Sequence, residues 1–166
     1  MAEMWLAADE VYKTMQELIS KYHPHLALVE NEIAILFKEK GSEIGGVKVM
    51  GKSGKASPIL SVLSNGKKWT FLITLGADMW QELTPPQQVA LLDHHLCALR
   101  AEENSETGVT KYFVAPPDVA FYKGEVERHG IWRTSNAPPT SNLVDELFGE
   151  TAAPSEAKKP KGKKTA

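Results

Sequence analysis

Hydrophobic positions recur at two different periods along this chain, and the two periods separate predicted helices from predicted strands. From Leu6 to Tyr22, apolar residues follow each other at three- and four-residue steps, namely Val11, Met15, Leu18 and Tyr22. That spacing places one apolar stripe on one face of a helix. The segment His23-Pro24-His25 ends this predicted helix, since proline does not continue a helix.

Alternation of apolar and polar residues predicts strands in two other segments. Residues 31–37 alternate around Ile33, Ile35 and Phe37, and residues 67–75 alternate around Trp69, Phe71 and Ile73. The segment 45–64 between them is rich in Gly, Ser and Val, and we expect one further strand at 47–50 with exposed loops around it. These segments predict a small mixed sheet.

Two more helices are predicted in the second half of the chain. Thr84 suits an N-cap, Pro85 suits the first helical position, and Gln87 can close a capping box, so a helix is expected over 85–101. Its predicted core stripe consists of Val89, Leu92, Leu96 and Leu99. A last helix is expected from about Asp118 to His129, ending at Gly130. Helices together with a small mixed sheet indicate an α+β fold.

Composition indicates one domain followed by a tail. With 166 residues of which 42% are hydrophobic, the chain can bury one core. We expect a domain over 1–135, a linker over 136–150 and a disordered lysine-rich tail over 151–166. A single cysteine allows no internal disulfide, and no apolar run predicts export or a membrane span. The prediction is a cytoplasmic protein that does not enter a membrane.

The run Asp93-His94-His95-Leu96-Cys97-Ala98 lies on the predicted helix 85–101 and has the outline of a zinc-protease motif. In a working His-Glu-x-x-His motif, two imidazoles one turn apart bind zinc and the Glu deprotonates the bound water. Only His94 remains here, because His95 stands at the Glu position and Ala98, at the second ligand position, has no donor atom. The sequence therefore has the helix of such a motif, but it lacks the carboxylate base and the second metal ligand that hydrolysis requires.

Further runs carry a resemblance over about residues 11–133: Glu32 to Phe37, Gly51 to Ser57, Leu91 to His94 and Val126 to Arg133. With the motif, these runs are similar to the phage metallopeptidase family, which implies a zincin-like fold. The resemblance places a third metal ligand at Pro117, which cannot bind metal. We therefore expect no catalytic residue, no metal and no cofactor, with His94, His95, Ala98 and Pro117 as vestigial positions.

In an alternative interpretation, the chain still binds a metal ion. His94 and His95 could hold one weakly with His23 or His25, as an unorthodox metal-dependent peptidase, although paired helical histidines are more often structural. Cys97 is predicted to be a buried structural thiol rather than a ligand or a nucleophile.

Charge is distributed unevenly. No acid occurs between Glu43 and Asp78, where five lysines are found, namely Lys48, Lys52, Lys55, Lys67 and Lys68. Lysines beside Trp69 suit a groove that tracks single-stranded DNA without sequence preference, although exposed lysines often serve solubility and Trp69 and Phe71 also suit a core. The tail adds Lys158, Lys159, Lys161, Lys163 and Lys164 against the single acid Glu156, a charge of about +4. Single-stranded DNA is the leading predicted partner.

A short acidic and apolar segment precedes the tail. Its apolar residues are Leu143, Val144, Leu147 and Phe148, and they surround two acids. This segment can dock on another phage or host protein, as expected of a host-takeover factor, or fold back onto its own domain. A second copy of the chain also remains open as a partner, and the family resemblance implies an infected bacterial host.

Overall fold

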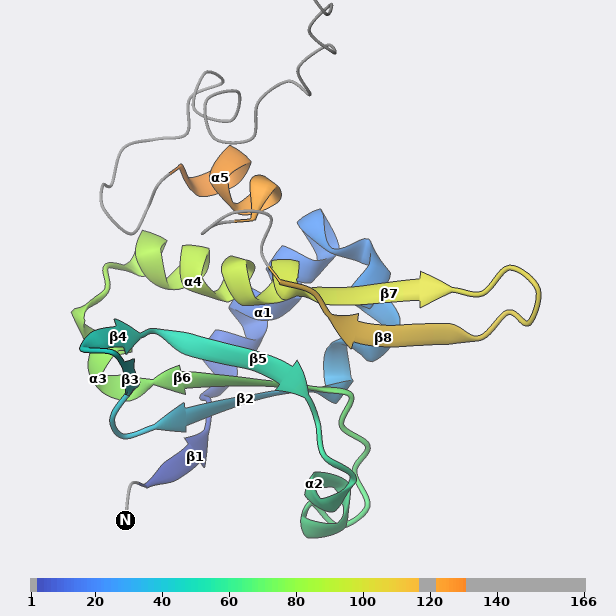
Figure 1. Cartoon of the computed structure of the whole chain (residues 1–166), viewed down its shortest axis with the longest axis horizontal. Helices are drawn as coiled ribbons and strands as arrows, with labels where there is room; N and C mark the ends of the chain where they lie inside the picture. Colours follow the sequence, from blue (N-terminus) through green and yellow to red (C-terminus); the bar gives the residue numbers. More distant parts are fainter. Residues whose placement is uncertain (1–2, 117–121, 131–166) are drawn as a thin grey trace, which may run out of the picture.

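A computed structural model describes residues 3–116 and 122–130 of the chain (Figure 1). A four-stranded sheet in the order β1-β2-β6-β5 lies at its centre. Its strands are β1 (Met4–Leu6), β2 (Ile33–Lys38), β5 (Gly51–Lys55) and β6 (Phe71–Gly76). The β2 and β6 strands are parallel, whereas β1 and β5 are antiparallel to their neighbours. The predicted mixed sheet is confirmed.

Among the described residues, two hairpins and six helical segments accompany this sheet. The hairpins pair β3 (Ser42–Ile44) with β4 (Val47–Val49), and β7 (Leu99–Glu103) with β8 (Thr110–Val114). The helical segments are α1 (Asp9–Tyr22), the 3-10 segment η1 (Pro24–Glu32), α2 (Pro58–Leu63), α3 (Ala77–Glu82), α4 (Pro85–Ala98) and α5 (Lys123–His129). The chain thus has the predicted α+β fold.

The main core lies between the sheet and the helices α1 and α4, which lie on the same side of the sheet in Figure 1. Because successive side chains of a strand point to opposite faces, β2 and β6 each present one face to these helices. The core-facing strand residues are Ile33, Ile35, Phe37, Phe71, Ile73 and Leu75, and each is at most 5% exposed. From the helices, Met15, Ile19, Leu92 and Leu96 pack against them.

The predicted first helix is correct in kind but wrong at its start. Met4–Leu6 forms β1, an antiparallel edge strand, and α1 begins only at Asp9. Tyr22 is 46% exposed rather than part of the core stripe, which Ile19 completes. The Tyr22 ring instead lies under the Arg128 guanidinium, 4.5 Å from the ring centroid.

Three other boundaries differ from the predictions. The helix expected over 85–101 ends at Ala98, because Leu99 adopts an extended conformation and starts β7. The strand expected over 67–75 begins at Phe71, so Trp69 precedes it. The segment 51–64, expected to form loops, contains β5 and α2. Val89 is only partly buried, whereas Leu92, Leu96 and Leu99 are buried as predicted.

The predicted start of α4 and the predicted end of α5 are confirmed. The Thr84 N–H donates to Gln87 Oε1 at 3.0 Å, as a capping box requires. Helix α5 ends at Gly130, whose φ of 65° favours glycine. Residues 118–121 of the predicted last helix, the linker and the tail lie outside the described residues. Within the described part of the chain, no helix is long and apolar enough to cross a membrane.

Candidate functional site

Asp93, at the start of the motif on α4, is the centre of a buried polar network. Its side chain is fully buried and contacts three basic groups from other segments. His23 Nε2 lies 2.5 Å from Oδ1, and His129 Nε2 lies 2.8 Å from Oδ2. Arg128 donates from Nε to Oδ2 at 2.6 Å and from Nη2 to Oδ1 at 2.8 Å. This Asp93 network joins the end of α1 to α4 and α5.

These contacts determine the ionisation of the groups involved. Burial alone would raise the pKa of Asp93, but hydrogen bonds from His129, His23 and Arg128 outweigh it and lower that pKa well below its ordinary value. Burial likewise works against the charge on Arg128, yet its bonds to Asp93 raise its pKa. Asp93 is therefore an acceptor-only carboxylate paired with a guanidinium, not a proton donor.

Cys97 lies one turn after Asp93 and is the buried thiol that was predicted. Arg128 Nη2 donates to its Sγ at 3.3 Å. Burial, followed by the negative charge of Asp93, raises the pKa of Cys97 to about 12. A thiol in this state is neither a nucleophile nor a ready metal ligand at neutral pH.

His94 keeps one feature of a metal-binding histidine. Its Nδ1 lies 2.6 Å from Oε2 of Glu125, whose side chain is fully buried on α5. A carboxylate on one ring nitrogen fixes the ring orientation and directs Nε2 away, as in metal sites. His94 and His95 line a hollow of about 400 Å³ together with Lys48 and Gly51.

His95, the neighbour of His94 on α4, has a packing role, and the centroids of the two rings lie 5.2 Å apart. Its Nδ1 lies 2.7 Å from Oγ of Ser53, which ties α4 to the edge strand β5. The side chain is 4% exposed, and a Cβ built on Gly51 would lie 2.5 Å from its Nε2. An imidazole at this position cannot act as the carboxylate base of the family motif.

The position of the second ligand is apolar. Ala98 is 4% exposed and packs with Cys97, Tyr122 and Val114. Pro117, the position of the third ligand, lies outside the described residues. A catalytic zinc requires about three protein ligands and an open position, so the donors of this site do not fit one.

The alternative metal grouping does not form either. His25 Nε2 lies 2.9 Å from the Leu99 carbonyl oxygen, and His23 is bound to Asp93, so neither joins His94. Another set of donor atoms, on His23, Asp93 and Cys97, lies within 4.8 Å of one another. Arg128 already binds both Asp93 and Cys97, so its positive charge occupies the place that a cation would need.

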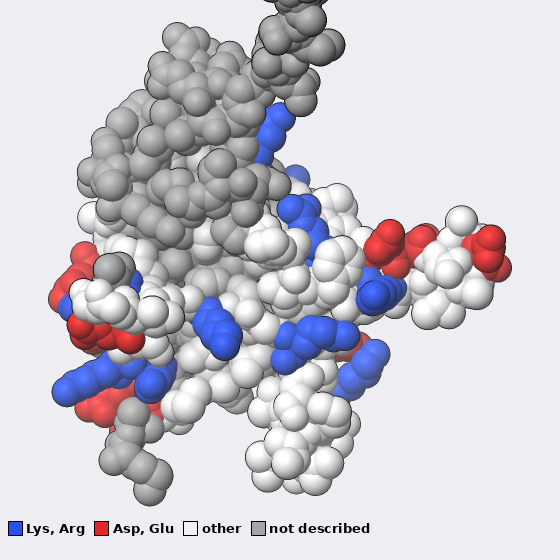
Figure 2. All heavy atoms as spheres, in the orientation of Figure 1, with Lys and Arg blue, Asp and Glu red and all other residues white. Residues whose placement is uncertain are grey.

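The predicted DNA-binding lysines do not form one patch. Alternation along β5 places Lys52 and Lys55 on opposite faces of the sheet, and Lys48 lies beside the two motif histidines. Lys68 pairs with Glu32 at 3.4 Å, and Lys67 lies over the Trp69 ring at 4.0 Å from its centroid. Figure 2 shows basic side chains across the middle of one face and acidic side chains towards its two ends.

Trp69 is a half-buried residue rather than an open stacking platform. Its indole N–H donates to Ser64 Oγ at 2.9 Å. Trp69 and Lys67 line a hollow of about 640 Å³ that also contains Asp9 and Glu30, and these acids oppose phosphate there. The five predicted tail lysines from Lys158 to Lys164 lie outside the described residues.

Sequence reasoning missed several residues of this site, namely Ser53, Asp93, Glu125, Arg128 and His129. The available signal was the run Glu127-Arg128-His129-Gly130, which carried part of the family resemblance. Nothing in the sequence paired it with Asp93, 35 residues earlier. Cross-element pairing of this kind becomes visible only once the helices are packed.

The histidine-bearing helix α4 packs against the edge strand β5 of the four-stranded sheet through His95 and Ser53. No curated protein and no solved structure matches the chain. One family model does match the chain, and the match includes all of the described residues. By that match, which covers residues 3–147, the chain belongs to the family described as Putative phage metallopeptidase.

Proposed function

We propose that this chain is a non-catalytic member of its family and works by binding. The observation that supports the proposal is the set of contacts made by the motif residues of α4. His94 keeps its carboxylate partner Glu125, while His95 is bound to Ser53 and Ala98 packs in an apolar cluster. The polar contacts support the structure, and the donor set lacks what hydrolysis requires.

Metal analysis and a peptidase assay test this proposal directly. The purified chain is expected to carry no stoichiometric zinc and to cleave no unfolded protein substrate, with or without added zinc. One equivalent of tightly held zinc, together with cleavage that a chelator abolishes, would instead establish the peptidase with an unorthodox site at His94 and His95.

For the ligand we propose single-stranded DNA, bound without sequence preference. The support is electrostatic: residues 44–77 contain no acid, and Lys48, Lys52 and Lys55 are exposed on β4 and β5. Lysine side chains on an exposed edge strand can follow a phosphate backbone. The basic tail from Lys158 to Lys164 adds charge to the same chain.

Fluorescence anisotropy with a labelled oligo-dT of about twenty nucleotides measures this binding, since one such site covers roughly 4–16 nucleotides. The log-log slope of affinity against salt should be about −0.7 per phosphate contact. Lys52→Ala and Lys55→Ala should each reduce that slope, whereas Lys13→Ala, an exposed lysine on α1, is the matched control. Binding that ignores salt, or lysine variants equal to the control, would contradict the proposal.

A protein-binding role is the second candidate, and α2 favours it. Ile59, Val62 and Leu63 are 67%, 75% and 77% exposed, so this short helix presents a contiguous apolar surface. Such surfaces on soluble domains commonly mark contacts with other proteins. Two results together would favour this role. The chain would bind no DNA at any salt concentration, and it would capture one host protein that the Val62→Ser variant does not capture.

A further inference from the structure

One face of the four-stranded sheet is left uncovered by α1 and α4, and we call it the open face. The register places four of its residues in one row across the strands, namely Leu6, Leu36, Thr74 and Lys52. Met4 and Lys38 are paired in the next row. Leu72 pairs with Gly54 on the other side of the first row.

The centre of the open face is apolar. Met4 and Leu6 are 53% and 56% exposed, and Leu36 and Leu72 are half-buried. A Cβ built on Gly54 would meet nothing within 4 Å, so the face is open to solvent there as well. An apolar sheet face of this kind is a surface that another segment can cover.

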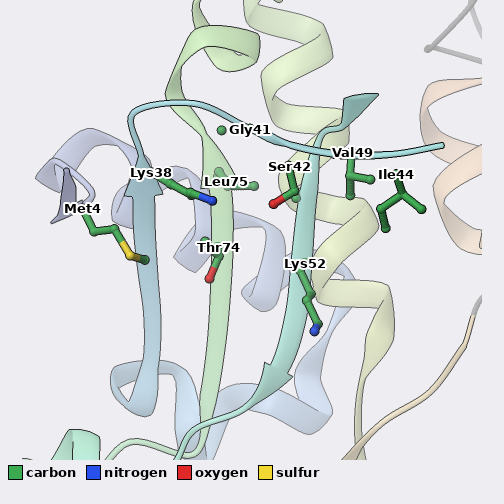
Figure 3. A pocket seen from close by; sticks show the side chains of 11 residues that line it. Met4, Lys38, Gly41, Ser42, Ile44, Val49, Lys52, Thr74 and Leu75 are labelled. Carbon is green, nitrogen blue, oxygen red and sulfur yellow. The ribbon is translucent and has the colours of Figure 1, made fainter. Parts of the chain in front are cut away.

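The rim of the open face is basic. Between the sheet and the β3–β4 hairpin lies a hollow of about 550 Å³, and its lining includes Lys38 and Lys52 but no acid. Figure 3 shows these two lysines on either side of Thr74, with Met4 on the outer strand. An occupant should therefore combine apolar side chains with negative charge.

We propose that residues 143–148 of the same chain, Leu143-Val144-Asp145-Glu146-Leu147-Phe148, dock on the open face. The segment holds two adjacent acids between two apolar pairs. Its apolar side chains cover the row of Leu6 and Leu36, and its acids face Lys38 and Lys52. The lysine-rich end of the chain, in contrast, would be repelled by this rim.

The chain is long enough for this contact. Twelve residues, 131–142, separate Gly130 at the end of α5 from Leu143. In a fully extended conformation, the chain from Gly130 to Leu143 spans up to about 45 Å, at 3.3–3.6 Å per residue. A domain with a radius of gyration of roughly 14 Å is about 36 Å across, so the extended linker is longer than the domain is wide. The contact is intramolecular, and it shares Lys52 with the proposed DNA-binding surface, so docking of the segment and binding of DNA would compete for that side chain.

Titration with a peptide tests the contact. The full chain carrying Leu147→Ser and Phe148→Ser, labelled with ¹⁵N, is titrated with a synthetic peptide of residues 141–150. Saturable shifts of amide signals in β1, β2 and β6 are expected. No saturable shift, or shifts confined to other elements, would overturn the proposal.

Charge reversal makes the test specific. Lys38→Glu with Lys52→Glu, added to the same variant, should weaken peptide binding about tenfold, because two attractive ion pairs become repulsive. A peptide with Asp145→Lys and Glu146→Lys should restore binding to this variant. The matched control Lys13→Glu should leave the affinity unchanged. If the Lys38→Glu, Lys52→Glu variant does not fold, the milder changes Lys38→Gln and Lys52→Gln replace it. They should give the same order of peptide affinities among the variants.

Molecular mass separates docking within one chain from exchange between copies. Amide signals of β1, β2 and β6 should differ between the parent chain and the Leu147→Ser, Phe148→Ser variant. At every concentration where they differ, light scattering should show that the parent chain is a monomer. A dimer that these two substitutions dissociate would overturn docking in the same chain and assign the open face to a second copy.

Discussion

The Arg128 guanidinium binds the fully buried Asp93 carboxylate through two of its nitrogens, at 2.6 and 2.8 Å. Asp93 directly precedes the motif histidines, so this pair fixes the motif helix α4 against α5. His23, following α1, binds the same carboxylate. These contacts position the motif helix, although His94 is the one expected ligand position of the motif that still holds an imidazole.

Asp93→Ala should destabilise the fold by about 3–5 kcal/mol, because it leaves the half-buried Arg128 charge without its partner. Urea unfolding followed by circular dichroism measures the free energy of unfolding. Glu17→Ala, an exposed acid on α1, is the matched control and should change it by less than about 0.5 kcal/mol. Equal stability of the two variants would show that the Asp93 network contributes nothing.

The same network predicts an acid limit to stability. The folded-state pKa of Asp93 is lowered by its hydrogen-bonded partners, so the folded state binds fewer protons at this group than the unfolded state does. Its contribution is complete above the unfolded value of about 3.9 and is lost as pH falls through the lower folded value. The stability difference between the parent chain and Asp93→Asn should therefore shrink below about pH 4.

That difference is measured by unfolding both chains in urea between pH 2.5 and 7. A difference that stays constant down to the lowest pH would mean that folding does not lower the pKa of Asp93.

Local features of the sequence predicted local structure well. The capping box of Thr84 and Gln87 and the stop at Gly130 are confirmed because each depends on neighbouring residues alone. The alternation around Ile33 and Ile35 also predicted β2, since the side chains of both residues face the core.

Features that depend on packing were not predictable from the same patterns. Gly51–Lys55 has no apolar alternation, yet it forms β5 because the β6 backbone offers a free edge. Met4–Leu6 continued the helical spacing of α1 but pairs with β2 instead. Lys52 and Lys55 are only three residues apart in the sequence, and only the strand conformation of β5 shows that they face opposite sides of the sheet.

The edge strand β5 offers a prediction with an internal control. A Cβ on Gly51 would lie 2.5 Å from His95 Nε2 and 2.9 Å from the Thr74 carbonyl oxygen, so Gly51→Ala must displace backbone or α4. Gly54, on the same strand, has nothing within 4 Å of the added Cβ. Gly51→Ala should cost about 1–3 kcal/mol, as overpacking does, whereas Gly54→Ala should change stability by less than about 1 kcal/mol.

Thermal or urea unfolding of the two variants checks this prediction under identical conditions. Comparable losses for Gly51→Ala and Gly54→Ala would mean that glycine is needed for strand conformation rather than for close contact with His95.

Restoring the missing donors should restore zinc binding. His94 already has its Nδ1 held by Glu125, so a second and a third imidazole would complete a plausible ligand set. His95→Glu, Ala98→His and Pro117→His together replace the three positions that depart from the family motif, and the triple variant should bind zinc at least tenfold more tightly than the parent chain. Calorimetric titration with zinc measures the affinity. Ala98 is buried beside Tyr122, so circular dichroism must first show that the triple variant is folded.

Two further variants decide whether any gain comes from the motif. Adding His94→Ala to the triple variant should abolish the gain, because it removes the one original ligand. Adding Glu125→Gln should weaken zinc binding by roughly 10–100-fold, the usual cost of losing the carboxylate behind a metal-binding histidine. A folded triple variant with no gain, or a gain that survives His94→Ala, would show that these positions do not correspond to the metal ligands of the family.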